Sequence, residues 1–385
     1  METDIMNPIV DWEDEKNSHV FLNPRMPDAL KTNIEESDLP HLPGHIWVAS
    51  SGTSATDELK LVALSKRALL VSAQAVVDHI HLGARDVWLD VLPHFHVGGL
   101  SIYARSHLTG AKVLAPENWK WNPERFQKLC DENAVTVTSL VPAQVYDLVS
   151  MQLPAPRDLR VAIVGGGAMR EGIYLLARKL GWPLLPSYGL TEAGSQVATA
   201  SLDTLRDVPE LVPGGEVLSH LEVKLAGNDL IQLKGGSLLT GLATITADNV
   251  EFSDPKVDGW LQTSDVGAWD GSKLRVLGRN DEVVKVGGEL VNLNRLNHTL
   301  HSLADDRGLD SRLLLVPLPS DRLGYEVALI YHQSLESMVP DLVSVFSGLV
   351  HPYEQIRSTY SVEVWPETDL GKVRTGQLVD LIREQ

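Results

Sequence analysis

The sequence contains very little cysteine: Cys130 is the only thiol among 385 residues. A single cysteine excludes a disulfide framework within the chain. Cys130 lies in the segment 126–132, whose apolar and charged residues have the spacing of an amphipathic helix. Because a free cysteine on such a helix usually packs like a small apolar side chain, we expect Cys130 in a core rather than in a catalytic site.

The sequence also lacks a long apolar run. No stretch approaches the roughly 20 apolar residues that cross a bilayer. Residues 1–6 contain neither the basic nor the apolar region of a secretory signal. Together with the shortage of cysteine, these absences lead us to expect a cytoplasmic protein without a membrane span.

Positive charge is scarce as well. The chain has 33 Lys and Arg against 51 Asp and Glu, a formal net charge of -18. Charge of this sign is repelled by phosphate backbones, so general nucleic-acid binding is disfavoured, whereas a local basic pocket for a nucleotide is compatible with it. Hydrophobic residues make up 43% of the chain, which is enough to build cores, and the length predicts two domains.

Strand-like and helix-like segments alternate between residues 45 and 188. We expect strands at 45–49, 60–64, 86–92, 111–114, 135–140, 159–164 and 183–188. We expect helices at 65–81, with Ser65 as the N-cap, and at 99–108, 123–133, 142–150 and 170–180. This alternation predicts an α/β fold in which helices cover both faces of a mostly parallel sheet.

The segments on either side of this region differ from it in composition and in the length of their predicted strands. Residues 1–44 are polar and punctuated by proline, which predicts an irregular segment with a weak helical patch at 28–33. Short strands at 221–225, 230–233, 243–245, 260–263 and 274–276 predict a small β-rich lobe that is antiparallel or barrel-like. Because strands and helices mix again later, we place a large N-terminal domain at 1–279 and a small α+β domain at 280–385, and the family resemblance described below implies that the small domain is mobile.

Three loops contain residues suited to a nucleotide. Residues 50–56 offer backbone N–H groups to phosphate oxygens, but they lack the Walker pattern, and such a segment is more often an ordinary polar turn. The glycines 165–167 close one strand, and 188–192 end the next. Each loop fits a tight turn or a flat ligand at the carboxyl end of a parallel sheet, and their neighbouring positions favour the ligand.

Two further patterns are ambiguous from the residues alone. His94 and His96 lack a third ligand at a convincing spacing, so a metal pair is a weak interpretation. Lys372 follows Gly371 in a segment typical of a turn, where a lysine is usually solvated.

Taken in order, these motifs resemble those of the acyl-adenylate-forming enzymes, the group of acyl-CoA synthetases, luciferases and peptide-synthetase adenylation domains. The resemblance extends from about residue 49 to residue 375. It rests on the segments 50–54, 60–69, 92–100, 188–192, 263–265, 278–281, 287–289 and 371–372. An ordered series of this kind is highly specific. It implies an AMP-forming acid–thiol ligase that uses a small carboxylate, ATP, Mg2+ and CoA.

Within the family, the segments 95–101, 165–168 and 188–196 are similar to those of the o-succinylbenzoate–CoA ligase subfamily of menaquinone biosynthesis. That likeness implies an aromatic acid with a second carboxylate. Arg105, one helical turn after Ser101, is a candidate cation for this carboxylate, and a surface salt bridge is an equally good interpretation. The alternatives are another aryl- or acyl-CoA ligase and a degenerate, non-catalytic nucleotide-binding homologue. A homodimer is compatible with each of them.

The resemblance also implies roles for individual residues. Its catalytic set is Lys372, Thr191, Glu192 and His96, with Lys372 as the cation near the α-phosphate and Glu192 as the ligand of Mg2+. Asp281 is the hinge. The other nucleotide-binding positions are Ser51, Gly52, Thr53, Ser54, Lys60, Gly166, Gly167, Tyr188, Gly189, Asp265 and Arg279. The acid-binding positions are His96, Gly99, Arg105 and Ser195.

Two departures from the family pattern qualify this assignment. Ala55 stands where the family usually has glycine, the loop is longer, and the proline before the lysine is missing. Alanine lacks the conformational freedom of glycine at positive φ, so we expect this loop to bind pyrophosphate differently from the loop of its relatives. The loop also begins unusually close to the start of the chain. We therefore expect a shortened N-terminal region and a differently built part of the acyl pocket or dimer surface.

Overall fold

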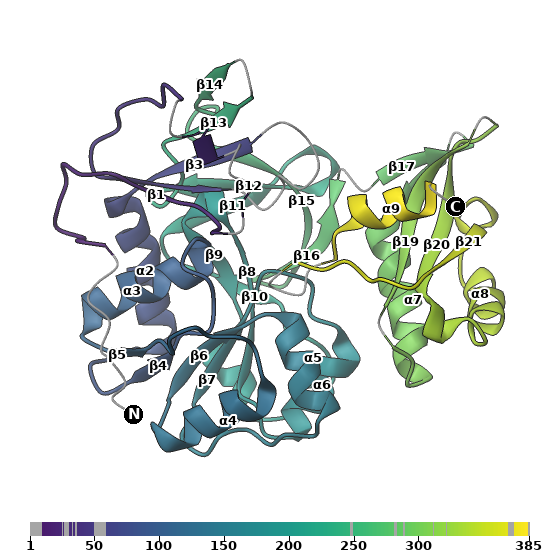
Figure 1. The fold of residues 1–385 in the computed structure, drawn as a ribbon, viewed down its shortest axis with the longest axis horizontal. Helices are drawn as coiled ribbons and strands as arrows, with labels where there is room; N and C mark the ends of the chain where they lie inside the picture. The colour runs from purple at the N-terminus through teal and green to yellow at the C-terminus, as the bar shows by residue number, and fades with distance from the viewer. Residues whose placement is uncertain are drawn as a thin grey trace.

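The computed structural model describes residues 10–24, 26, 31–32, 34, 37–49, 59–246, 249–280, 283–287, 289–310, 312–320, 322–368 and 373–383. Figure 1 shows a large unit and a smaller one beside it, which begins with strand β17. The predicted fold class, α/β followed by a small α+β unit, is confirmed.

An 11-stranded sheet runs through the large unit in the order β11-β12-β15-β16-β10-β9-β8-β7-β6-β4-β5. Its parallel part consists of β4 Val87–Leu89, β5 Lys112–Leu114, β6 Val137–Leu140, β7 Val161–Val164 and β8 Leu184–Leu190. Its antiparallel part consists of β9 Ser195–Thr199, β10 Gly215–Val217, β11 Leu221–Leu225, β12 Leu230–Gly235, β15 Leu261–Asp270 and β16 Lys273–Arg279. The antiparallel strands predicted after residue 200 thus mostly continue the parallel sheet.

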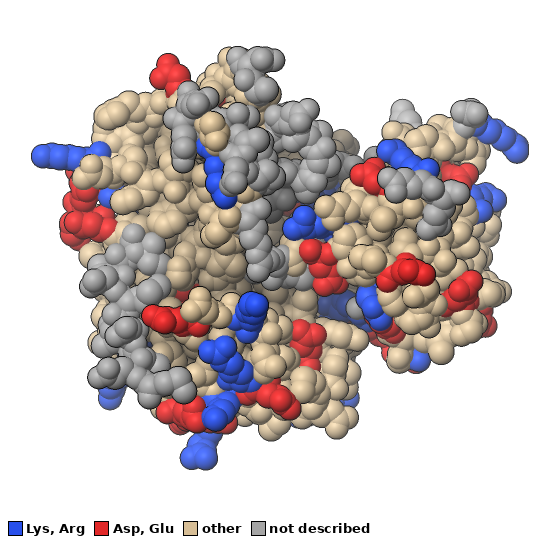
Figure 2. Space-filling model, viewed as in Figure 1, with Lys and Arg blue, Asp and Glu red and all other residues tan. Residues whose placement is uncertain are grey.

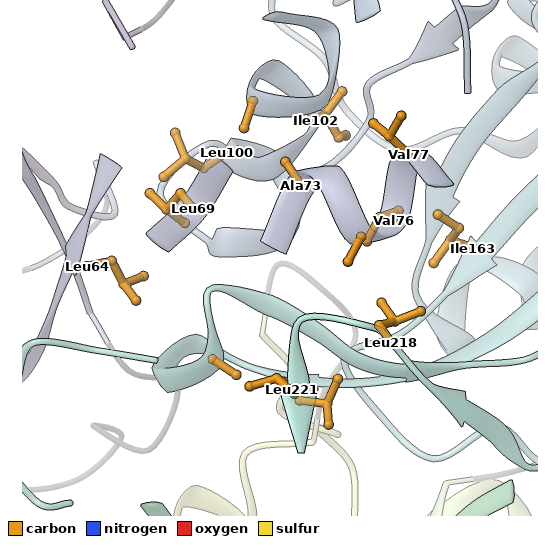
Figure 3. Packing of buried hydrophobic residues seen from close by; sticks show 14 of the residues in the cluster. Leu64, Leu69, Ala73, Val76, Val77, Leu100, Ile102, Ile163, Leu218 and Leu221 are labelled. Atoms are coloured by element: carbon orange, nitrogen blue, oxygen red, sulfur yellow. The ribbon is translucent and has the colours of Figure 1, made fainter. Parts of the chain in front are cut away.

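Helices cover both faces of the parallel part. They are α2 Lys66–Ile80 and α3 Val97–Thr109 on one face, and α4 Pro123–Glu132, α5 Pro142–Ser150 and α6 Glu171–Lys179 on the other. Strand β7 shows the physical reason, because all four of its residues are buried. Val161 and Ile163 join the core beneath α2 and α3, and Ala162 and Val164 join the other core. Figure 3 shows Ile163 beside the side chains of α2.

A second sheet of the large unit lies next to α2 (Figure 1). It consists of β1 His19–Phe21, β2 His45–Ala49, β3 Leu59–Ser65, β13 Gly241–Ile245 and β14 Val250–Ser253. The expectation of an irregular segment before residue 45 is wrong at β1, which pairs in parallel with β2 and is too short to show an alternating pattern. Ser65 caps α2 as predicted, and its Oγ accepts a hydrogen bond from the Ala68 N–H at 3.0 Å.

The described residues of the small unit form one five-stranded sheet and three helices. They are β17 Val283–Val286, β18 Glu289–Asn292, α7 Leu293–Asp306, β19 Leu313–Ser320, β20 Gly324–His332, α8 Val339–Ser347, β21 Ile356–Val362 and α9 Thr375–Arg383. Apolar residues of α7 and α8 pack on one side of the sheet, and Leu378 and Ile382 of α9 pack on the other. The small unit therefore has a core of its own.

Cys130 is 1% exposed, and burial raises the pKa of its thiol to about 12, so the predicted core position is confirmed.

Figure 2 shows acidic and basic side chains interspersed over the face in view. No helix among the described residues is long and apolar enough to cross a membrane. The described residues also form short 3-10 helices at Thr191–Ala193, Leu202–Leu205, Gly227–Asp229, Gln333–Leu335 and Pro352–Glu354.

Candidate functional site

The centre of the candidate site is the hairpin formed by β8, the 3-10 turn Thr191–Ala193 and β9. A Cβ on Gly189 would lie 2.3 Å from the Ser195 carbonyl oxygen, so only glycine allows the two strands to come this close. Gly194 has φ +72° and turns the chain into β9. The pairing of the sheet changes from parallel to antiparallel at this hairpin, where the charge of Glu192 acts on Tyr188.

Tyr188 reaches a residue far away in the sequence. Its hydroxyl donates a hydrogen bond of 2.6 Å to Oδ2 of Asp265 in β15. Asp265 stands opposite Arg279 in the register of β15 and β16. Thr263 fixes the same strand, because its Oγ1 accepts a hydrogen bond of 3.0 Å from the Asp265 N–H. The structure thus brings together three residues that sequence analysis assigned to one nucleotide.

Glu192 belongs to the same cluster. Burial raises the pKa of its carboxyl, the negative charge of Asp265 raises it further, and Arg279 lowers it in part. The site therefore contains two carboxylates close enough to repel each other. Such a pair is typical of a place where a cation or a hydrogen-bonding ligand binds.

The glycine turn at 165–167 follows β7, the strand that pairs with β8 of this cluster. Gly166 and Gly167 are exposed, and Gly166 has φ +81°. A Cβ on Gly166 would lie 3.6 Å from Val141, and one on Gly167 would lie 3.7 Å from Pro142. Both glycines follow the carboxyl end of the parallel strand β7, where the absence of side chains leaves room for a flat ligand.

A second group of residues lies between α3 and β9. Arg105 is only 1% exposed, and its Nη2 donates a hydrogen bond of 3.3 Å to the Ser195 Oγ, which Ser101 also contacts at 3.3 Å. The guanidinium stacks over Trp88 at 5.2 Å, and burial lowers the pKa of Arg105 to about 9. The interpretation of Arg105 as part of a surface salt bridge is wrong, because the side chain is buried.

Arg105 has no carboxylate partner among the described residues, and its Nε lacks a hydrogen-bond partner there. Ser195 has φ +147°, a conformation that L-residues rarely adopt, and strain of this kind is concentrated at functional sites. A buried charge without a partner costs several kcal/mol. The arrangement therefore suits an anion that arrives with a ligand.

The loop before α3 supplies the remaining acid-binding candidates. His96 is the N-cap residue of α3, and its ring lies 4.6 Å from that of Phe95. A Cβ on Gly99 would lie 2.4 Å from the Pro93 carbonyl oxygen, so Gly99 is required where the helix passes this loop. Both residues are half-buried or buried beside the helix that holds Arg105.

Sequence analysis missed a polar cluster next to these residues. The His94 Nε2 lies 2.7 Å from Oδ2 of the buried Asp90 and 3.1 Å from the Tyr103 hydroxyl. Burial and the charge of Asp90 raise the pKa of Tyr103. Only one signal in the sequence points to this cluster, namely a carboxylate directly after the apolar strand β4. His94 thus has a defined partner that its spacing from His96 did not reveal.

Several predicted site residues fall elsewhere. Lys60 is an exposed residue of β3, opposite Thr244 of β13. The phosphate-loop residues Ser51, Gly52, Thr53 and Ser54, the hinge residue Asp281 and the catalytic candidate Lys372 lie outside the described residues. Strands β2 and β3, which flank the loop, pair antiparallel from His45 and Ser65 to Ala49 and Leu61.

The sheet changes from parallel to antiparallel pairing at a glycine-rich hairpin with two carboxylates beside it, an arrangement that suits a nucleotide-binding α/β protein. The chain belongs to the family of AMP-binding enzymes, whose model matches residues 48–241, about half of the chain. The family predicted from the motifs is therefore confirmed.

Among curated proteins, the chain is similar to 2-succinylbenzoate–CoA ligase of Listeria monocytogenes serotype 4b (strain F2365). The two are 28% identical over 311 residues, which are 80% of this chain and 64% of that protein. The match therefore spans less than two thirds of the length of this relative.

Two solved structures share the fold. A variant of E. coli MenE with bound OSB-AMS has a TM-score of 0.75 and 21% identity, and the match covers 97% of this chain and 89% of that one. O-succinylbenzoate coenzyme A synthetase (MenE) from Bacillus subtilis, in complex with ATP and magnesium ion, has a TM-score of 0.71 and 20% identity, with 87% and 70% covered. At these identities the likeness concerns the fold.

Proposed function

We propose that this chain is an ATP-dependent acid–CoA ligase that adenylates o-succinylbenzoate and transfers the acyl group to CoA, with release of AMP and pyrophosphate. Family membership and the name of the curated relative support this reaction. On the likeness of the motifs, we also propose a place in menaquinone biosynthesis and in the cytoplasm. The observation that most favours a dicarboxylic acid is the buried guanidinium of Arg105 beside Ser195, which has no carboxylate partner in the part of the chain that the structure describes. It lies next to the hairpin that holds the nucleotide candidates.

The nucleotide end of the site supports an adenosine. Asp265 is the acceptor for ribose hydroxyls, and Arg279, opposite it in the sheet, supports the same sugar. Gly166 and Gly167 have no side chains that would cover a flat base, and Tyr188 and Gly189 belong to β8, the strand that pairs with β7 before these glycines. The Tyr188 hydroxyl also orients Asp265 before the nucleotide arrives.

The residues present also fit Mg2+. No three carboxylate, histidine or cysteine side chains form a metal cage in the part of the chain that the structure describes. Mg2+ commonly binds through one or two carboxylates together with substrate phosphates, and Glu192 with the hydroxyl of Thr191 suits this arrangement. When bound, the ion neutralises charge on the phosphates. A cation there would also relieve the repulsion between Glu192 and Asp265.

In the first step, a carboxylate oxygen of the acid bonds to the α-phosphorus while the bond to pyrophosphate breaks. Negative charge collects at the α-phosphate, and Lys372 is the proposed cation there, with the loop residues Ser51 and Thr53 on the other phosphates. In the second step, the sulfur of CoA bonds to the acyl carbon, its proton leaves, and the bond to AMP breaks. His96 and Gly99 line the path of the acyl group.

Two units and one hinge fit this two-step reaction. β16 ends at Arg279 and β17 begins at Val283, which supports a domain boundary between 279 and 280 and a hinge at Asp281. Rotation about one or two residues is sufficient to move a small domain with its own core. The small domain would present Lys372 in the first step and withdraw it for the second.

The test is pyrophosphate release from ATP and Mg2+ in the presence of a panel of acids, followed by thioester formation with CoA. The panel contains o-succinylbenzoate, an analogue that lacks its ring carboxylate, benzoate and fatty acids. We expect release with o-succinylbenzoate and much less with the monocarboxylates. Release only with benzoate or fatty acids would contradict the acid assignment and leave another acyl-CoA ligase. Nucleotide binding without release for any acid would contradict the catalytic assignment.

A further inference from the structure

One ion pair joins the large unit to the small unit. Arg170, the N-cap residue of α6, forms an ion pair through Nη2 with Oδ1 of Asp305, and its Nε donates a hydrogen bond of 3.2 Å to Oδ2. Asp305 lies in the last turn of α7. Both side chains are 18% exposed. Two parallel contacts between a guanidinium and a carboxylate fix the relative orientation of the two side chains as well as the distance between them.

The surroundings make this contact specific. Gly172, two residues after Arg170, lies so close to α7 that a Cβ on it would be 3.3 Å from Oδ2 of Asp305. Burial lowers the pKa of Arg170, and its Nη1 lacks a hydrogen-bond partner among the described residues. All other ion pairs between described residues join two residues of the same unit. Asp305 is therefore the carboxylate that contacts Arg170 across the two units, and the charge of Asp310 in the small unit also acts on the guanidinium.

A second pair of charges at the same interface acts in the opposite direction. Burial raises the pKa of Glu367 in the small unit, and the charge of Asp147 in α5 raises it further. Burial likewise raises the pKa of Asp147. Arg312 and Asp310 also act on Glu367, with opposite signs. The two units thus share one ion pair, between Arg170 and Asp305, and one pair of carboxyls, Glu367 and Asp147, whose charges repel each other.

Two described residues that flank Lys372 in the sequence, Glu367 and Val373, lie beside each other in the small unit. Glu367 pairs with Val373 in an isolated bridge, on either side of the stretch that includes Lys372. Because Glu367 interacts with Asp147, this edge faces the large unit. Figure 1 shows the chain between β21 and α9 extending toward β16.

We propose that Arg170 and Asp305 are positioning residues, whose ion pair holds the small unit in the orientation used by the adenylation step and opens for the thioester step. The inference rests on the proposed function, since that function supplies the two steps. The inference adds the contact that sets the equilibrium of the small unit between the orientation for adenylation and the orientation for thioester formation.

The experiment measures both steps and the orientation. Fluorophores on Lys128→Cys and Glu336→Cys, two exposed positions in different units, report the distance between the units, and Cys130 is too buried to react. Asp305→Asn and Arg170→Asp are compared with the double variant Arg170→Asp/Asp305→Arg, which restores the pair with reversed charges. Asp203→Asn, which removes an exposed ion pair with Arg206, is the matched control.

We expect each single variant to lower pyrophosphate release about tenfold, equivalent to about 1.4 kcal/mol, and to broaden the distance distribution. Thioester formation from added acyl-adenylate should stay the same or rise, and the double variant should recover most of the lost release. Unchanged distances in the single variants, a parallel loss of both steps, or no recovery in the double variant would overturn the proposal. Because the distances need no substrate, they test the contact even if no acid is adenylated.

Discussion

Replacement of Arg105 by methionine should separate stability from acid recognition. The side chain is 1% exposed, and burial of an ion costs several kcal/mol even after the surroundings relax. Stacking over Trp88 offsets about 1–2 kcal/mol of this cost. The hydrogen bond to Ser195 offsets about 1 kcal/mol more. We therefore expect Arg105→Met to leave the free energy of unfolding unchanged or raise it by about 1–2 kcal/mol.

The effect on the reaction should have the opposite sign. A charge-assisted hydrogen bond to the second carboxylate contributes about 1.5–3 kcal/mol. Its loss should lower kcat/KM for o-succinylbenzoate by a factor of about 10–150. For the analogue that lacks the ring carboxylate, kcat/KM should change little. Wild-type protein should be stabilised by added o-succinylbenzoate and ATP, and the variant should gain less.

The assays are acid-dependent pyrophosphate release and urea unfolding with and without the acid. Arg105→Lys is the matched control, because it keeps the charge and loses the two-pronged geometry. A variant that unfolds more easily than wild type and loses activity equally for both acids would refute the reasoning. Arg105 would then be a structural residue that stabilises the contact between α3 and β9.

Three other changes test separate parts of the account. Lys372→Ala should abolish pyrophosphate release while nucleotide binding, measured by titration, stays nearly intact; equal activity would exclude its assigned role. Gly99→Ala places a Cβ 2.4 Å from the Pro93 carbonyl, so it should destabilise the fold by about 1–3 kcal/mol and raise KM for the acid more than KM for ATP. Burial raises the pKa of Asp86, but hydrogen bonds led by Arg160 lower it to about 2, below its unfolded value of about 3.9. The stability that Asp86 contributes is therefore present above about pH 4 and lost as the pH falls toward 2. Asp86→Asn should cost about 1–2 kcal/mol at pH 7 and flatten this dependence in urea unfolding, and an unchanged slope would contradict the ion pair.

The sequence predicted those parts of the fold that depend on local patterns. Helices α4, α5 and α6 begin and end within a few residues of their predicted positions, because proline, asparagine and apolar spacing mark their ends and buried faces. The family followed from short motifs in a fixed order. The strand β1 was missed because three residues give no period, and its pairing with β2 depends on contacts far along the chain.

By itself, the sequence determined the α/β class, the family and the residue types available for a nucleotide and an acid. Only the tertiary structure decided which of them meet. Tyr188 and Asp265 are 77 residues apart and share a hydrogen bond, Arg105 is buried against Ser195, and Arg170 reaches Asp305 across the two units. The physical reason is that periodicity and turn chemistry are local, whereas burial and partners depend on how sheets and helices pack.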